Sequence, residues 1–438
     1  MFGKSLLFSV LPQTQALYGF LIAILLLAGG GIIGAAKVGI TTPVGIIAIG
    51  ASLAVGLAAV SAIGQGMAAA SGIASISEKK EMFGKSLIFS IIPETQALMG
   101  FLIAVLLMIG AGIMGGIKMA VTMPAGLISL GAGLAIGLAG VSAVGQGYVI
   151  SSGIAVTAKI KKMFGKSLLF SVLPQTQALY GFLIAILLLV GGGLIGVIKP
   201  GINISTGLVA IGAGIAVGLA AVSAIGQGIA AAGGVTSTAD NEKMFGKGII
   251  FSVIPETQAL NGFLISILLL ITGGIVGTAK PELTVPIGLV AIGAGIAVGI
   301  AAFSAIGQGI VANSGTGAVT EKPKLFGISI LFTVLPETQA LYGIIVSVLL
   351  LTGVGLFSTI KAGVTLTQGL SGIGIGLAMG LAAVSAIGQG VVAASSVGSS
   401  LRNRTALGKS LVLSAIPETY AIFGLLISIL VMIGIKLM

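Results

Sequence analysis

Six copies of a nine-residue motif recur along this chain of 438 residues at a constant spacing of 81 residues. The copies begin at Leu11, Ile92, Leu173, Ile254, Leu335 and Ile416 and read LPQTQALYG, IPETQALMG, LPQTQALYG, IPETQALNG, LPETQALYG and IPETYAIFG. A second motif, SAIGQG or SAVGQG, recurs five times between them on the same period. Repetition at a fixed period means that one supersecondary unit has been copied. The chain must therefore fold as an array of similar units.

The composition identifies the environment in which these units fold. Hydrophobic residues make up 56% of the chain and charged residues only 7%, whereas soluble domains carry about 25% charged residues. The chain is therefore a membrane protein. It contains no Cys and no His, which removes the usual ligands of zinc, haem and iron–sulfur clusters and the thiol and imidazole nucleophiles.

Each 81-residue unit contains two apolar stretches. In the first unit they run from about residue 2 to 36 and from about residue 43 to 76, and both exceed the roughly 20 residues that a helix needs to cross a bilayer. This pattern predicts an all-α membrane protein of tandem transmembrane hairpins with about eleven spans. The predicted units are the hairpins 1–81, 82–162, 163–243, 244–324 and 325–405 and the final outer helix 406–438.

The two stretches of a unit differ in the size of their side chains. The stretch that carries the nine-residue motif is rich in Leu, Ile and Phe, and we call it the motif helix. Its partner is dominated by Gly, Ala and Ser, and we call it the glycine-rich helix. Small residues let the backbones of transmembrane helices approach closely. We therefore predict two layers, a tight inner circle of glycine-rich helices with the bulkier motif helices outside, forming part or all of a ring.

The basic residues gather on one side of the predicted membrane. Fifteen of the 21 lie in or beside the ends where a glycine-rich helix is followed by a motif helix: Lys4, Lys79, Lys80, Lys85, Lys159, Lys161, Lys162, Lys166, Lys243, Lys247, Lys322, Lys324, Arg402, Arg404 and Lys409. The opposite ends hold Lys37, Lys118, Lys199, Lys280, Lys361 and Lys436. An excess of Lys and Arg is typical of cytoplasmic loops, so we expect the first set to face the cytoplasm. This distribution accounts for the net charge of +11 without a nucleic-acid partner.

The first motif helix has no glycine-rich helix before it. Met1 aligns with Met82, Met163 and Met244, which are internal to the repeat. We therefore expect the natural chain to begin further upstream, with another glycine-rich helix.

Four carboxylates lie within the predicted spans, all at the third position of the motif. They are Glu94, Glu256, Glu337 and Glu418. A charge at the centre of a bilayer costs about 2.5–3.5 kcal/mol on insertion scales, and such residues are functional by default. Gln13 and Gln175 occupy this position in the other two copies. We expect them to preserve the shape and polarity of the glutamate side chain without its charge.

A glutamine of each glycine-rich helix lies at the same predicted depth as a motif carboxylate. Gln65 precedes the Lys79–Lys80 turn by about as many residues as Glu94 follows it, so two antiparallel helices joined there bring both side chains to one level. The same relation pairs Gln146 with Gln175, Gln227 with Glu256, Gln308 with Glu337 and Gln389 with Glu418. Together with the Thr and Gln that follow each motif position, and a carbonyl freed by the motif proline, these oxygens predict a compact cage for an alkali cation.

These motifs, PETxA, LPxTQxLY and the glutamine of the glycine-rich helix, resemble those of the membrane rotor proteolipid, the c or K subunit of V-type and A-type rotary ATPases. The resemblance covers essentially the whole chain. In the sodium-type members that it resembles, a site joins three consecutive helices. One motif helix supplies a Leu carbonyl, Thr, Gln and a latching Tyr, the glycine-rich helix supplies Gln, and the next motif helix supplies Glu.

Carried over to this sequence, the resemblance implies four ion sites with a carboxylate and one without. The first is Leu11, Thr14, Gln15, Tyr18, Gln65 and Glu94; the third is Leu173, Thr176, Gln177, Tyr180, Gln227 and Glu256; the fourth is Ile254, Thr257, Gln258, Gln308 and Glu337; the fifth is Leu335, Thr338, Gln339, Tyr342, Gln389 and Glu418. Asn261 replaces the tyrosine of the fourth site. The second site is Ile92, Thr95, Gln96 and Gln146, which meets Gln175 and has Met99 at the tyrosine position. Tyr420 replaces Gln in the last motif, so no site should begin there.

The resemblance further implies a rotor subunit that is no enzyme on its own and that couples Na⁺ or H⁺ translocation to ATP hydrolysis or synthesis by rotation. The implied partners are copies of itself or other proteolipids, a stator membrane subunit, a central-stalk subunit on the cytoplasmic side, and lipid. No organic cofactor is implied, and the long concatenated repeats favour a prokaryotic plasma membrane. Four carboxylates over six motif helices favour an ATP-driven pump, because fewer ions would move per revolution than in a fully populated ring.

Two other functions fit the sequence less well. A secondary cation transporter built from repeats commonly has a single midplane site, whereas the predicted sites here are distributed, one to a hairpin. A passive cation channel with a glutamate ring would place its carboxylates on the pore-lining helices. In this sequence they lie on the bulky motif helices and not on the glycine-rich ones.

Overall fold

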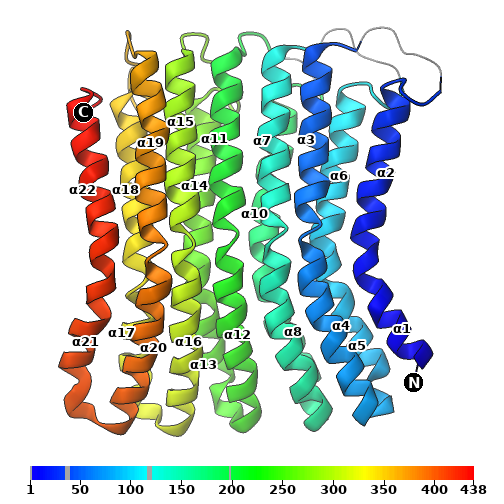
Figure 1. The fold of residues 1–438 in the computed structure, drawn as a ribbon, viewed down its shortest axis with the longest axis vertical. Coiled ribbons are helices and arrows are strands. Elements are labelled where there is room, and N and C mark those ends of the chain that lie inside the picture. The colour runs from blue at the N-terminus through cyan, green and yellow to red at the C-terminus, as the bar shows by residue number, and fades with distance from the viewer. Residues whose placement is uncertain (1, 35–39, 116–120, 197–198) are drawn as a thin grey trace.

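The computed structural model describes residues 2–34, 40–115, 121–196 and 199–438. Within these ranges it contains eleven helical spans that are long and apolar enough to cross a membrane, and no strand. The spans stand side by side in chain order from the N-terminus to the C-terminus (Figure 1). The predicted all-α array of tandem hairpins is confirmed. Met1, Lys37 and Lys118 lie outside the described residues.

Each glycine-rich helix consists of two stacked segments that are separated by a short turn. The pairs are α3 (Thr42–Ala58) with α4 (Ser61–Glu78), α7 (Met123–Ala139) with α8 (Ser142–Lys159), α11 (Ile204–Ala220) with α12 (Ser223–Asp240), α15 (Val285–Ala301) with α16 (Ser304–Glu321), and α19 (Leu366–Ala383) with α20 (Ala386–Arg402). The turn immediately precedes the SAxGQG motif, except in the last copy, where it takes in the serine.

The motif helices are interrupted at the motif proline. Their segments are α1 (Phe2–Val10) and α2 (Thr14–Gly29), α5 (Phe83–Ile91) and α6 (Thr95–Gly110), α9 (Phe164–Val172) and α10 (Thr176–Gly191), α13 (Phe245–Val253) and α14 (Thr257–Thr272), α17 (Phe326–Val334) and α18 (Glu337–Gly353), and α21 (Leu407–Ala415) and α22 (Thr419–Gly434). In five of the six, the first three motif residues form a 3₁₀ turn, as at Leu173–Gln175. Proline cannot donate the i→i−4 bond of an α-helix, and a tighter turn accommodates that loss.

Neighbouring glycine-rich helices form one layer whose backbones touch. A Cβ atom added at Gly145 would lie 1.9 Å from the carbonyl oxygen of Ala224, and one at Gly226 would lie 1.9 Å from that of Ala305. Only glycine fits at such an approach. The prediction that small residues make this layer narrow is confirmed.

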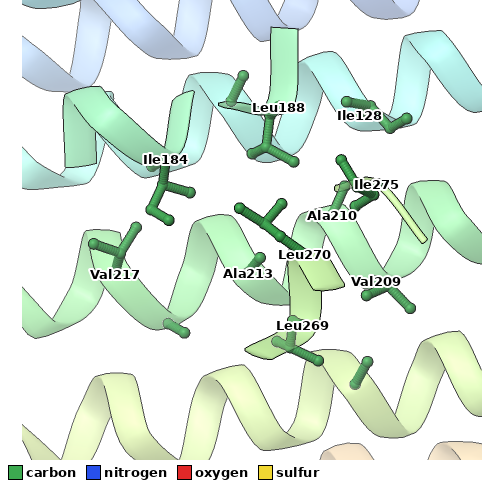
Figure 2. Close-up of a cluster of buried hydrophobic side chains, with 14 of the residues drawn as sticks. Ile128, Ile184, Leu188, Val209, Ala210, Ala213, Val217, Leu269, Leu270 and Ile275 are labelled. Atoms are coloured by element: carbon green, nitrogen blue, oxygen red, sulfur yellow. The ribbon is translucent and has the colours of Figure 1, made fainter. Parts of the chain in front are cut away.

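The motif helices pack as a second layer against the glycine-rich helices. Figure 2 shows Ile184 and Leu188 of α10 gathered with Val209, Ala213 and Val217 of α11 and with Leu269 and Leu270 of α14. The opposite face of the motif helices exposes large apolar side chains, among them Leu102, Leu183 and Leu264. Such a surface suits lipid.

Basic side chains link consecutive repeats at the end that is predicted to be cytoplasmic. The Lys79 Nζ donates to the Ala158 carbonyl oxygen at 2.6 Å, and the Lys322 Nζ donates to that of Leu401 at 2.7 Å. Both acceptors are near the C-terminal ends of glycine-rich helices, where a positive charge is favourable.

Candidate ion-binding sites

The third site shows how three consecutive spans converge on one carboxylate. The hydroxyl of Tyr180, on α10, donates to Glu256 Oε1 at 2.8 Å. The amide nitrogen of Gln227, on α12, donates to Glu256 Oε2 at 2.9 Å. The amide of Gln177, also on α10, donates to Gln227 Oε1 at 2.7 Å. Both oxygens of the carboxylate are thus held by side chains from other helices.

A threonine connects this chain of amides to the backbone. The Thr176 Oγ1 lies 3.1 Å from the Leu173 carbonyl oxygen and 3.1 Å from Gln177 Oε1. The sequence predicted a carbonyl left bare by the proline. In the structure the 3₁₀ turn closes instead, and both the Thr176 backbone N–H and its hydroxyl contact the Leu173 carbonyl. The carbonyl is nevertheless part of a continuous set of oxygen-bearing groups.

The first and fifth sites repeat this arrangement. In the first, Tyr18 donates to Glu94 Oε1 at 2.6 Å, Gln65 donates to Glu94 Oε2 at 3.4 Å, and Gln15 donates to Gln65 at 2.6 Å. Thr14 donates to the Leu11 carbonyl at 3.0 Å. The three side-chain distances in the fifth site are 2.6 Å for Tyr342 to Glu418, 3.3 Å for Gln389 to Glu418 and 3.0 Å for Gln339 to Gln389, and Thr338 is 2.9 Å from the Leu335 carbonyl.

The fourth site has the same amides but no tyrosine. Gln258 donates to Gln308 at 2.8 Å, and Gln308 donates to Glu337 Oε2 at 3.1 Å. Thr257 is 2.9 Å from the Ile254 carbonyl. Among the described residues the buried amide nitrogen of Asn261 has no hydrogen-bond partner.

The second site is built in the same way around an uncharged group. Gln96 donates to Gln146 at 2.7 Å, and Gln146 is 3.5 Å from Gln175 Oε1. Thr95 is 2.9 Å from the Ile92 carbonyl. Met99, which stands at the tyrosine position, is partly buried against the apolar core. In the last motif, Tyr420 is 68% exposed, and among the described residues it begins no such chain of amides.

The amides and the carboxylates differ in burial. The glutamines of the first, third, fourth and fifth sites are at most 2% exposed, and buried amides need partners of this kind. The four carboxylates are only partly buried. Each site therefore has a closed, amide-lined interior and a carboxylate toward its edge.

Sequence reasoning missed the serine that opens every copy of the second motif. Ser142 accepts from the Gln96 amide at 3.3 Å, and Ser385 donates to Gln339 Oε1 at 2.8 Å. The equivalent Ser61, Ser223 and Ser304 are fully buried, and their hydroxyls have no partner among the described residues. The unvarying serine in SAxGQG was the signal that could have identified it.

Two aromatic contacts were missed as well. The ring of Tyr18 lies 5.4 Å from that of Phe101, and the ring of Tyr180 lies 5.2 Å from that of Phe263. Such contacts restrict the tyrosine ring. They hold the hydroxyl in place beside the carboxylate.

Comparison with known families accounts for the repeat. The family of the ATP synthase C subunit matches residues 49–107, 130–188, 211–269, 285–350 and 373–431. Each matched segment starts in a glycine-rich helix and ends in the next motif helix, so it contains the glutamine of the SAxGQG motif together with the motif position that this glutamine faces, such as Gln65 with Glu94.

Individual relatives are similar over shorter lengths. The A-type ATP synthase subunit K of Methanocaldococcus jannaschii is 46% identical over 228 residues, which cover 52% of this chain and 96% of that protein. The V-type sodium ATPase subunit K of Enterococcus hirae is 36% identical over 131 residues, or 30% of this chain and 80% of that protein. The A-type ATP synthase subunit K of Sulfolobus acidocaldarius is 49% identical over 87 residues, or 19% of this chain and 85% of that protein.

Five family matches in tandem, eleven apolar spans among the described residues and the similarity to K subunits agree with one another. The chain therefore belongs to the family of the ATP synthase C subunit, as a multi-hairpin integral membrane proteolipid of the V/A type that is not an enzyme by itself.

Proposed function

We propose that this chain is the ion-carrying rotor subunit of a V/A-type ATPase and that it carries Na⁺ at Glu94, Glu256, Glu337 and Glu418. The convergence of three spans on one carboxylate, as at Glu256, carries the proposal. One monovalent cation neutralises one carboxylate, and a neutral site is the form that can face lipid. Carbonyl, hydroxyl and amide oxygens complete the coordination that a hard cation prefers.

The mechanism follows from the cost of an uncompensated charge in the membrane. Each carboxylate keeps its cation while it faces lipid, and releases it only beside a stator subunit that supplies a fixed positive charge and access to water. The membrane potential acts with about 2.3 kcal/mol per charge per 100 mV. Passage of each ion is thereby coupled to rotation of the ring, and nucleotide chemistry takes place on other subunits.

The amide and threonine oxygens favour Na⁺ over H⁺ as the cargo. A proton needs only the carboxylate, whereas Gln227 donates to Glu256 and is joined through Gln177 to Thr176. The oxygens of these side chains would serve as further ligands for Na⁺. The sodium ATPase subunit among the relatives supports the same choice. H⁺ is the alternative cargo.

The orientation in the membrane follows from the distribution of Lys and Arg, and the assembly into a ring follows from the two lateral edges of the helical array. The loops with excess Lys and Arg face the cytoplasm and there meet the central stalk, in a prokaryotic plasma membrane. The two lateral edges adjoin copies of this chain or other proteolipids to complete the ring. The motif helices contact lipid and the stator subunit.

Carbodiimide labelling tests the cargo directly. The reagent modifies neutral carboxylic acids, so a bound cation should protect them. We expect Na⁺, and not the same concentration of K⁺, to suppress labelling of all four carboxylates in the assembled complex, as read by peptide mass spectrometry. Labelling that depends on pH but not on Na⁺ would contradict a sodium site and favour H⁺.

The uncharged second site offers a test of ion stoichiometry. Gln175→Glu should create a fifth carboxylate, because Gln146 already faces that position. We expect the number of ions moved per ATP to rise toward five-fourths of its original value. Measured ratios that are equal for the two rings would show that carboxylate number does not set the stoichiometry, and would remove the argument for a pump.

A further inference from the structure

The fourth site differs from the other charged sites at the position that holds the carboxylate in place. Asn261 stands where the first, third and fifth sites have a tyrosine. Ile344 stands where the first and third sites have Phe101 and Phe263, the rings that contact those tyrosines. The fourth site therefore lacks the latch. It also lacks the aromatic ring, as does the fifth site, where Leu425 stands at that position.

With this exchange, one hydrogen-bond donor and one acceptor of the fourth site lack a partner among the described residues. Glu94, Glu256 and Glu418 each accept a tyrosine hydroxyl on Oε1 and a glutamine amide on Oε2. Glu337 accepts only the Gln308 amide on Oε2, and no donor among the described residues reaches its Oε1. The buried amide nitrogen of Asn261 likewise lacks an acceptor there.

A carboxamide is shorter than a phenol by roughly the length of the ring, so Asn261 does not span the distance that tyrosine spans. The buried amide nitrogen of Asn261 is costly without a partner, whereas Glu337 is only partly buried. A water molecule, which occupies about 30 Å³ in the liquid, can join a donor and an acceptor of one site that do not bond directly.

We propose that the fourth site binds a water molecule between Asn261 Nδ2 and Glu337 Oε1, and that it therefore holds its cation less firmly than the three latched sites. The inference rests on the proposed function and distinguishes one site within it. A direct hydrogen bond to a charged group is replaced by one to a mobile water, so the carboxylate turns toward the edge of the ring more readily. The four carboxylates are then not equivalent carriers.

The experiment compares the four carboxylates in one sample. The assembled ATPase in membranes is treated with carbodiimide at graded Na⁺ concentrations, and the peptides containing Glu94, Glu256, Glu337 and Glu418 are distinguished by mass, since their flanking sequences differ. We expect half-protection of Glu337 to need about tenfold more Na⁺ than that of Glu256, the ratio that corresponds to one hydrogen bond to a charged group. Equal half-protecting concentrations would overturn the proposal.

Three variants assign the cause. Asn261→Tyr should lower the half-protecting Na⁺ concentration of Glu337 to that of Glu256. Tyr180→Asn should raise the half-protecting concentration of Glu256 to that of Glu337. The other carboxylates should keep their original half-protecting concentrations. Asn261→Leu removes the amide that would hold the water, and should loosen the fourth site further. A half-protecting Na⁺ concentration of Glu337 that is unchanged in Asn261→Leu would overturn the water bridge.

Failure of this inference can be told apart from failure of the proposed function. If Na⁺ protects none of the four carboxylates, the sodium cargo is wrong. In that case the labelling rates measured without Na⁺ still distinguish carboxylates with a tyrosine latch from Glu337, which has none. We expect Glu337 to react fastest. If Na⁺ protects all four at one concentration, the cargo stands and the inequivalence of the fourth site is refuted.

Discussion

Replacing Glu256 by Gln is expected to reduce ATP-driven Na⁺ transport by about 100-fold or more. Position 175, one repeat earlier, is already Gln, so the variant has two neighbouring sites without a carboxylate. When they pass the stator, its positive charge lacks a partner for two steps instead of one. Removing one member of a buried charge pair costs about 3–5 kcal/mol, and each 1.36 kcal/mol is about a factor of ten in rate.

The measurement is ²²Na⁺ uptake by vesicles containing the reconstituted ATPase, with ATP hydrolysis followed in parallel. Glu282→Gln is the matched control, because the Glu282 carboxylate is half exposed in a loop and forms only a loose ion pair with Lys280, at 4.0 Å. This variant should leave transport unchanged. Gln has nearly the same shape as Glu, so we expect Glu256→Gln to fold, and recovery of intact ring verifies this. Retention of more than half of the transport rate would show that Glu256 carries no essential ion.

Replacing Gly226 by Ala is expected to destabilise the array far more than one added methyl group does on an open helix face. The added Cβ would lie 1.9 Å from the Ala305 carbonyl oxygen, which belongs to the backbone of the next glycine-rich helix and cannot rotate away. Overpacking of a tight interior costs about 1–3 kcal/mol, occasionally more. The two helices would have to separate, and the motif helices that they position would move with them.

Thermal stability in detergent, followed by size-exclusion chromatography, measures this effect. Gly317→Ala provides the control, because Gly317 is also in a glycine-rich helix but has no atom within 4 Å of an added Cβ. Alanine is favoured over glycine in a helix interior by up to about 1 kcal/mol, so this control should be as stable as the original chain or slightly more stable. Equal unfolding midpoints for the two variants would refute the close approach of the backbones.

The level at which the sites lie could be predicted because it depends on distance along the chain. Two antiparallel helices joined at Lys79 place Gln65 and Glu94 opposite each other by residue count alone, and the structure joins them by a hydrogen bond. Hydropathy likewise required eleven spans, the number found in the described part of the chain. The pairing of Tyr18 with Glu94 was accessible only through the family resemblance, since 76 residues separate the two.

Several contacts between different spans could not be derived in this way. The Tyr18–Phe101 contact, the Lys79 bond to the Ala158 carbonyl and the role of Ser142 beside Gln96 all join different spans. They depend on the rotation of each helix about its axis and on the spacing between layers. The 3₁₀ turn at the motif is a further case: the proline indicated a break in the helix, but not that the threonine hydroxyl would close on the carbonyl that it was expected to leave bare.

The amino-acid sequence by itself determined the periodic all-α membrane architecture, the small-residue layer and the common depth of the carboxylates, because composition and spacing act locally and repeat. Only the tertiary structure decided which oxygen of each carboxylate meets which donor, and that Asn261 and Glu337 are left with unused hydrogen-bonding capacity in the same site, among the residues that the structure describes. Those outcomes depend on lateral packing to within a fraction of an ångström, and similar motifs become different sites when one side chain changes.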